Sequence, residues 1–170
     1  MRWSKMTEYS FKEFYELQKG LDADIASKHP GVTYETTFEK RLLALFVELG
    51  EFANETRCFK FWSLKGPSPK ERILDEYADA LHFILSLGLA IGVSEYKHAL
   101  KKADLTLSQG ILRVYEKVLS FDESRDEAHY EAAFASFLDL LPLMGYDYSD
   151  MEEAYRAKLA VNYQRQEQKY

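Results

Sequence analysis

The sequence predicts an all-α protein, folded as a helical bundle of about five to seven helices. Three observations favour this fold class. Proline and glycine are scarce, at 4 and 8 of 170 residues, so little interrupts helix formation. The alternation of apolar and polar residues that marks a strand is rare. Long segments instead carry apolar residues at helical spacing.

The first helix is expected over residues 8–27, and Pro30 and Gly31 end that region. Its apolar residues recur at helical spacing and are Phe11, Phe14, Tyr15, Leu17, Leu21 and Ile25. Thr36, followed three residues later by Glu39, matches a capping box and predicts the start of a second helix. We expect that helix to continue to about Arg57.

The segment "FKFWSLKGPSP" is predicted to be an ordered loop, aromatic first and turn-like later. Ser68 as cap, Pro69 at the first helical position and Glu71 in the first turn predict the start of a third helix. That helix should run to about Ile91, because Gly92 is a typical stop signal.

The last third of the chain predicts further helices. Residues 95–121 are expected to form one or two, and residues 127–143 another, ending near Pro142 and Gly145. Ser149 with Glu152 is a third capping box, so the final helix should run from about residue 150 into the tail.

Composition narrows the class of protein. With 46% hydrophobic and 29% charged residues the chain is able to build a core, and its length predicts a single domain over residues 1–170. The net charge of −6 argues against nucleic acid as a partner. The single cysteine, Cys58, excludes an internal disulfide and is typical of a reducing cytoplasm.

The sequence also predicts no membrane partner. The first ten residues, "MRWSKMTEYS", contain no apolar signal core. The most hydrophobic run, 77–91, carries Asp79 and His82 and is too short to span a bilayer. We therefore expect a soluble protein of the cytoplasm.

Two pairs of acidic residues stand in the two most apolar helices. Glu48 and Glu51 are three residues apart in the second helix, and Glu76 and Asp79 repeat this spacing in the third. Burying ionised carboxylates together is costly, and no lysine or arginine lies within either apolar stretch. A divalent cation removes that cost, and ligands that are all oxygen suit Mg²⁺ or Mn²⁺.

Each of these features also has a plain structural explanation. A single ExxE or ExxD in a helix is typically a solvated face, and only the pairing within apolar surroundings favours a metal. Zinc and di-iron fit less well, because the di-iron bundles use Glu-x-x-His and here the fourth residue is Glu or Asp. On position alone, His82 is a hydrogen-bonded core histidine.

The segments "VELGEFANETRCFKFWS" and "LDEYADALHFILSLG" resemble the all-α dimeric dUTPase family, within the MazG-like nucleoside triphosphate pyrophosphohydrolases. Near the start, "LQKGLDADI" resembles the first helix of that family. Near the end, "KLAVNYQRQEQKY" resembles its C-terminal motif.

The resemblance implies a homodimeric, Mg²⁺-dependent enzyme, with Mn²⁺ as an alternative ion, that hydrolyses dUTP to dUMP and pyrophosphate. A metal-activated water would attack the phosphoanhydride. The residues implied are Glu48 and Glu51 for catalysis; Glu48, Glu51, Glu76 and Asp79 for the metal; Arg57, Lys60, Lys65, Lys158 and Arg165 for the phosphates; and Gln18, Trp62, His82, Phe83 and Asn162 for the base and sugar.

Three alternatives stay open at this point. The substrate of a related pyrophosphohydrolase would be dCTP or a modified nucleotide. A regulatory module without catalysis would use the same scaffold, but all four acidic positions are intact. A purely structural bundle gives no reason for acids on the two most apolar helices.

Overall fold

The computed structural model describes residues 7–169 and is all-α, as the sequence predicts. In chain order the elements are β1 (Tyr9–Ser10), α1 (Lys12–Lys28), α2 (Tyr34–Thr56), α3 (Lys70–Ala90), β2 (Lys97–His98), α4 (Leu107–Ser124), α5 (Glu127–Leu138), α6 (Leu140–Leu143) and α7 (Tyr148–Glu167). Within the described residues, strand is limited to one antiparallel pair, β1 with β2. No helix among them combines the length and apolarity that crossing a membrane requires.

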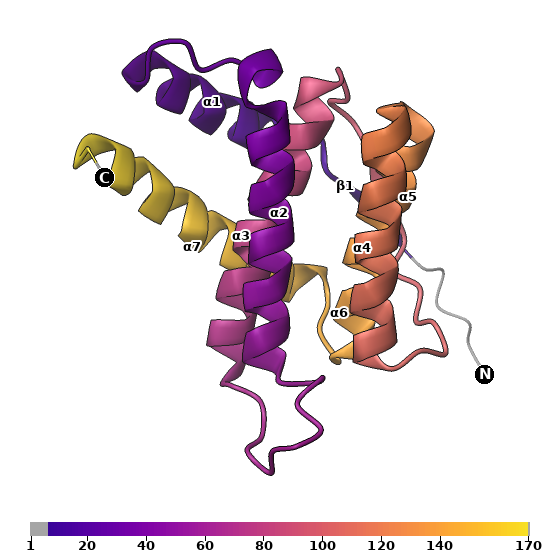
Figure 1. Cartoon of the computed structure of the whole chain (residues 1–170). Helices are drawn as coiled ribbons and strands as arrows, with labels where there is room; N and C mark the ends of the chain where they lie inside the picture. The colour runs from indigo at the N-terminus through magenta and orange to yellow at the C-terminus, as the bar shows by residue number, and fades with distance from the viewer. Residues whose placement is uncertain (1–6, 170) are drawn as a thin grey trace.

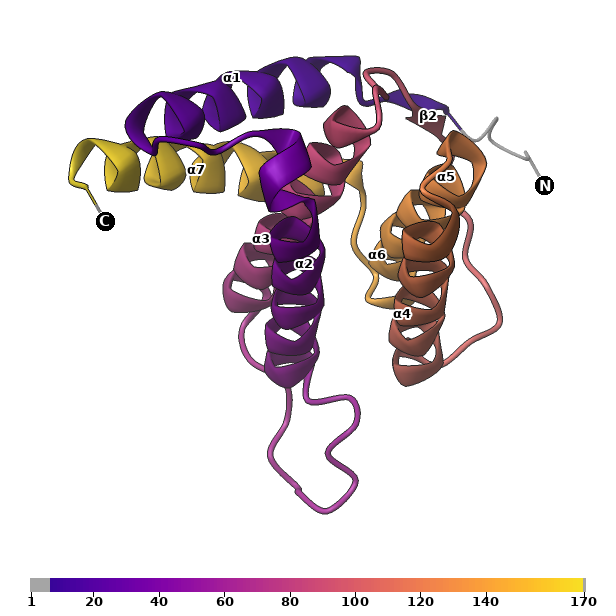
Figure 2. The same ribbon diagram turned by 45° about the horizontal axis from the view of Figure 1, so that its top comes forward.

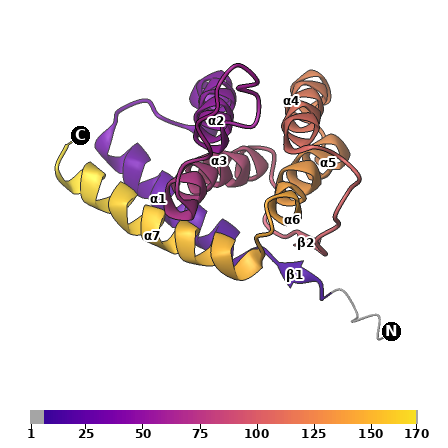
Figure 3. The same ribbon diagram turned by 90° about the horizontal axis from the view of Figure 1, so that it is seen from below.

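The helices form three groups (Figure 1). α2 and α3 run antiparallel and are joined by the loop 57–69, which extends beyond their ends (Figure 2). α4 and α5 form a second hairpin, with the short α6 beside it. α1 and α7 lie next to each other, and both pack across α3 (Figure 3).

α3 is the central helix of the core. It packs against α1, α2, α5 and α7, and twelve of its residues are buried. Tyr77 shows how it is held: its ring stacks on Phe137 of α5 at 4.2 Å between centroids, and its hydroxyl donates to the Phe137 carbonyl at 3.0 Å. A helix enclosed on most sides holds its side chains in defined places, which matters for the polar residues that it carries.

Two helix starts differ from the sequence prediction. The cap of α2 is Thr33, and not Thr36 as predicted. Thr36 is the third residue of the helix, and the side chain of each of these two threonines accepts a hydrogen bond from the backbone N–H of the other. α7 is likewise capped by Asp147 with Asp150, in place of the predicted Ser149. In both helices the cap and its hydrogen-bond partner three residues later are residues that commonly cap helices. The sequence prediction therefore placed the start of each helix too late.

The predicted cap of α3 is also wrong. The Ser68 hydroxyl donates to the Glu55 carboxylate, and Pro69 occupies the cap position without a side-chain hydrogen bond to the helix. Glu55 also pairs with Arg72 at 3.0 Å. The serine therefore fastens the loop 57–69 to the end of α2.

The region 95–106 is not helical, in contrast to the prediction, and contains only the short strand β2. Tyr9 and Ser10 pair with His98 and Lys97, and α4 begins only after the Thr106 cap. The helix predicted over 127–143 is divided after Leu138 into α5 and α6. At this break Asp139 accepts from His98 Nε2 at 2.7 Å and from the backbone N–H of residue 101 at 2.9 Å.

Candidate active site

Three of the four predicted metal ligands converge. Oxygen atoms of Glu48 on α2 and of Glu76 and Asp79 on α3 all lie within 4.8 Å of one another. Glu51 is exposed and is not one of these three acids. Its carboxylate nevertheless lies next to that of Glu48, because both a side-chain hydrogen bond and the charge of Glu51 raise the pKa of Glu48, and its charge also raises the pKa of Glu76. The cluster Glu48–Glu76–Asp79 is called the acidic cluster below.

The packing of α2 against α3 places the acidic cluster at the edge of the core. On α2 the residues Leu45, Leu49 and Phe52 are buried, and Glu48 lies among them at helical spacing. On α3 the buried residues Tyr77 and Ala78 lie between the two acids. The three carboxylates are consequently half-buried beside apolar side chains, and two of them, Glu48 and Asp79, also line a cavity.

Electrostatics show what this placement costs. Burial, reinforced by Asp79, Glu51 and Glu76, raises the pKa of Glu48 from 4.5 to about 7. Burial and the neighbouring acids raise the pKa of Glu76 to about 7 as well. Oε2 of Glu48 is buried and has no hydrogen-bond partner among residues 7–169. At neutral pH the acidic cluster therefore needs bound protons or a nearby cation to offset its negative charge.

One cation does reach the acidic cluster, from a helix distant in sequence. Lys158 of α7 is buried, with Nζ 2.9 Å from Asp75 Oδ1 and 3.0 Å from Asp79 Oδ2. Burial alone would lower the pKa of Lys158, but these two hydrogen bonds outweigh it, and the pKa is raised. Burial nevertheless keeps the pKa of Asp79 above its usual value, despite this lysine. Both ion pairs of Lys158 go to Asp75 and Asp79, away from the unpartnered oxygen of Glu48.

A cavity opens beside the acidic cluster, between α1, α3 and α7. Glu48 and Asp79 line it from one side. Its other lining residues are Gln18, Leu21, Asp22, Ile25, His82, Phe83, Ser86, Asn162, Arg165 and Gln166. Four of the five residues predicted for the base and sugar are among them, namely Gln18, His82, Phe83 and Asn162, together with the predicted phosphate ligand Arg165.

The loop residues predicted for the nucleotide lie elsewhere. Arg57 donates from Nε to the Lys65 carbonyl at 3.0 Å, and both residues line a separate depression near Glu55. Lys60 lies over the Phe59 ring at 5.7 Å. Trp62 is 64% exposed on the loop 57–69. The structure does not bring these side chains to the cavity of the same chain, and their roles stay predictions.

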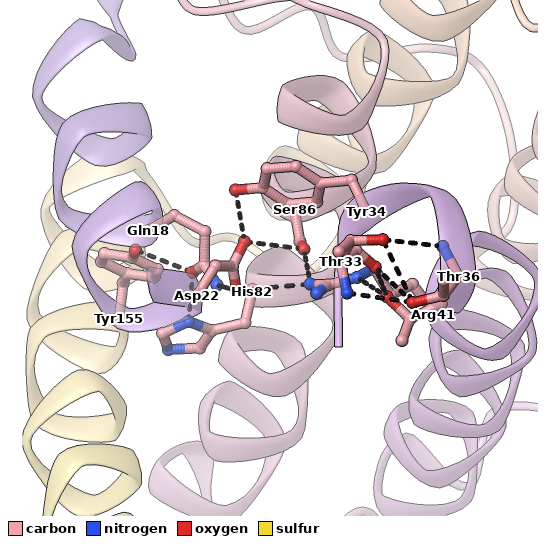
Figure 4. Close-up of polar contacts among 10 residues, drawn as sticks. Gln18, Asp22, Thr33, Tyr34, Thr36, Arg41, His82, Ser86 and Tyr155 are labelled. Carbon is pink, nitrogen blue, oxygen red and sulfur yellow. Dashed lines mark hydrogen bonds and ion pairs between the residues drawn. The ribbon is translucent and has the colours of Figure 1, made fainter. Parts of the chain in front are cut away.

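The sequence analysis missed a buried polar network, several members of which line the cavity. It joins Gln18 and Asp22 of α1 to Arg41 of α2, His82 and Ser86 of α3 and Tyr155 of α7 (Figure 4). The available signal was Asp22, which follows Gln18 by four residues and therefore shares its face of the first helix. An acid on the apolar face of a helix indicates a buried partner.

Comparison with known proteins bears on this arrangement. A family model described as dUTPase matches residues 10–170. Comparison with curated proteins finds no significant match. The family model covers nearly the whole chain, including every residue of the acidic cluster and of the cavity lining. The chain therefore belongs to the all-α dUTPase family, whose members are nucleoside triphosphate pyrophosphohydrolases that act on dUTP.

Proposed function

We propose that the protein is a Mg²⁺-dependent dUTP pyrophosphatase, which converts dUTP and water to dUMP and pyrophosphate. The observation that carries the proposal is the acidic cluster with its unpartnered Glu48 Oε2, facing a cavity that also holds amide side chains. Acids alone would suit many cation sites. Their position beside Gln18 and Asn162, whose amides offer both donors and acceptors, suits a nucleotide.

Glu48, Glu76 and Asp79 are the residues that would hold the metal, with Glu51 at the margin of the site. Their donor atoms are all carboxylate oxygens, which favours Mg²⁺ or Mn²⁺ over zinc. The buried Glu48 oxygen, which has no partner of its own, fits a cation ligand. When bound, a divalent cation supplies charge neutralisation of the phosphate oxygens and makes the phosphorus easier to attack.

The side chains of this chain would transfer the proton and bind the phosphates. Glu48 accepts the proton of the attacking water through the carboxylate oxygen that does not hold the cation. The water oxygen bonds to phosphorus as the phosphoanhydride bond between the α and β phosphates breaks, and pyrophosphate leaves. Glu51 contributes by holding negative charge next to Glu48. Arg165 lines the same cavity and offers a positive charge for the phosphates.

A substrate screen with and without the metal tests the proposal. We expect dUTP with Mg²⁺ to yield dUMP and pyrophosphate, and excess EDTA to abolish the reaction, because the acidic cluster then has no compensating cation. The measurement is product analysis for dUTP, dCTP, dTTP, dATP and dGTP under both conditions. Preferred turnover of dCTP would show that the enzyme selects cytosine and not uracil, while the type of reaction would stand. Turnover of no nucleotide at all would favour a binding module without catalysis.

We also propose that the enzyme is a homodimer. Large apolar side chains are exposed on neighbouring faces of α2 and α4, and these are Leu43, Val47, Leu112 and Leu119. The loop 57–69 adds Phe61 and Leu64, which are almost fully exposed. Such surfaces usually mark an interface. Sedimentation at micromolar concentration should give twice the monomer mass of 19.8 kDa, and a monomer would contradict the dimer.

The compartment is part of the proposal as well. The single Cys58 is free and exposed, which suits a reducing environment such as the cytoplasm.

A further inference from the structure

The polar network beside the cavity is centred on one buried carboxylate, Asp22, which itself lines the cavity. Asp22 is 6% exposed and accepts at both of its oxygens. Gln18 Nε2 donates to Oδ1 at 3.0 Å, while the hydroxyls of Tyr34 and Ser86 donate to Oδ2 at 3.0 and 2.9 Å (Figure 4). Arg41 adds an ion pair at 3.4 Å and also donates to Ser86. Every neighbour named here offers a proton or a positive charge, so Asp22 serves purely as an acceptor.

An acceptor at this place decides which way the Gln18 amide points. If the amide were reversed, its oxygen would face a carboxylate oxygen, and two acceptors would meet without a proton between them. The Nε2 group therefore faces Asp22, and Oε1 faces the opposite side. There Oε1 receives two donors, the Tyr155 hydroxyl at 3.1 Å and His82 Nδ1 at 2.5 Å.

The amide oxygen in turn decides the tautomer of His82. Because Oε1 only accepts, the proton of the imidazole must be on Nδ1. Burial, assisted by Lys158, lowers the pKa of His82 to about 3, so the ring is neutral and carries this one proton. Nε2 is left with a lone pair. It is buried and has no hydrogen-bond partner in the described part of the chain, although the ring lines the cavity.

We propose that Asp22, held by Arg41, is a positioning residue that fixes His82 as the Nδ1–H tautomer through the Gln18 amide, so that Nε2 is offered to the nucleotide as a hydrogen-bond acceptor. The inference rests on the proposed function for the identity of the ligand. The inference requires that the ligand donate a hydrogen bond to His82 Nε2 from an O–H or N–H group. A deoxyuridine nucleotide has two such donors, the imide N–H of the base and the 3′-hydroxyl of the sugar.

The tautomer is measured directly on the free protein, without substrate or metal. In ¹⁵N-labelled protein, the Nδ1 signal of His82 should have the shift of a protonated ring nitrogen and the Nε2 signal that of an unprotonated one. Protonated Nε2 in the unaltered protein would overturn the proposal, whatever the activity on dUTP. This measurement also separates the proposal from the proposed function, because it involves no turnover.

Variants test whether Asp22 is responsible. Asp22→Asn places a group that both donates and accepts next to Gln18, so the amide loses its preference and the two ¹⁵N shifts should move towards each other. Tyr34→Phe is the matched control: it removes a donor to Oδ2 but keeps the contact of Gln18 with Oδ1, so both shifts should stay in place. Unchanged shifts in Asp22→Asn would contradict the role of Asp22.

A double variant distinguishes positioning from general damage to the fold. Gln18→Glu combined with Asp22→Asn exchanges carboxylate and amide, so position 18 again presents an acceptor to His82 Nδ1. The protonated Nδ1 signal should return in this variant. A mixed tautomer there, in a protein whose helical circular dichroism is normal, would count against the relay.

Kinetics identify the donor on the ligand. In Asp22→Asn, KM for dUTP should rise roughly five- to tenfold with a smaller change in kcat, which is the size expected for one lost hydrogen bond. If the 3′-hydroxyl is the donor, the unaltered enzyme should already bind 2′,3′-dideoxy-UTP more weakly than dUTP by this factor. Asp22→Asn should then not weaken the binding of 2′,3′-dideoxy-UTP any further. If the imide N–H is the donor, the dideoxy nucleotide should lose affinity in the variant as dUTP does. An unchanged KM for both nucleotides would show that Nε2 does not contact the ligand.

Discussion

Glu48→Gln should lower kcat for dUTP hydrolysis by roughly 10²- to 10⁴-fold, the usual contribution of a general base. Glutamine keeps the shape of the side chain and one acceptor oxygen. It cannot take a proton from water, and it removes one negative charge from the metal ligands. The substitution thus replaces a half-buried carboxylate, one oxygen of which has no hydrogen-bond partner in the described part of the chain, by a neutral amide.

The control for this variant is Glu39→Gln, which alters an exposed glutamate on the same helix and should leave kcat unchanged. Thermal unfolding without metal should show Glu48→Gln to be at least as stable as the unaltered protein, because the substitution removes a charge from a half-buried acidic cluster. Steady-state assays and melting curves on the same samples therefore separate lost chemistry from lost folding. Retention of more than about a tenth of the activity would rule out Glu48 as the base.

The affinity for a divalent cation should rise steeply between about pH 5 and pH 7, by up to about tenfold per pH unit for each proton displaced. Glu48 and Glu76 both have a pKa of about 7 in the folded protein without metal, against 4.5 ordinarily. A cation binds their deprotonated forms, so protons compete with it throughout this range. Mg²⁺ or Mn²⁺ titration by calorimetry at several pH values measures the slope.

The same pKa shifts give the sign of the effect on stability. Because folding raises these two pKa values, the protonated acids contribute stability that is fully present below about pH 4.5 and is lost as the pH rises through about 7. Added Mg²⁺ should therefore raise the melting temperature at about pH 8 and have little effect at about pH 5. Glu48→Gln with Glu76→Gln should abolish this difference, whereas Glu71→Gln, an exposed acid on α3, should preserve it. A stabilisation by Mg²⁺ that is equal at both pH values would contradict a site built from these acids.

The sequence was most informative where a signal is local. The apolar periodicity of α2 and α3 predicted both helices to within a few residues, and the loop 57–69 followed from its turn-forming residues. Starts were less well predicted, as Thr33 and Asp147 show, because several capping residues stand close together at each helix start. The region 95–106 was missed for a different reason. It contains the short strand β2, which pairs with β1 nearly ninety residues earlier in the chain, and sequence periodicity does not show such a distant partner.

The sequence by itself predicted the fold class and the two pairs of acids, because helical periodicity and the i,i+3 spacing are properties of one helix at a time. Its resemblance to the all-α dUTPases indicated the family. Only the tertiary structure decided which charges meet. It brought Lys158 to Asp79 and left Glu48 Oε2 without a partner, and it placed Asp22 behind Gln18 and His82. It also set the loop cations apart from the cavity of their own chain. The physical reason is that electrostatic and hydrogen-bond energies depend on distance and burial across helices, and neither quantity is encoded in local spacing.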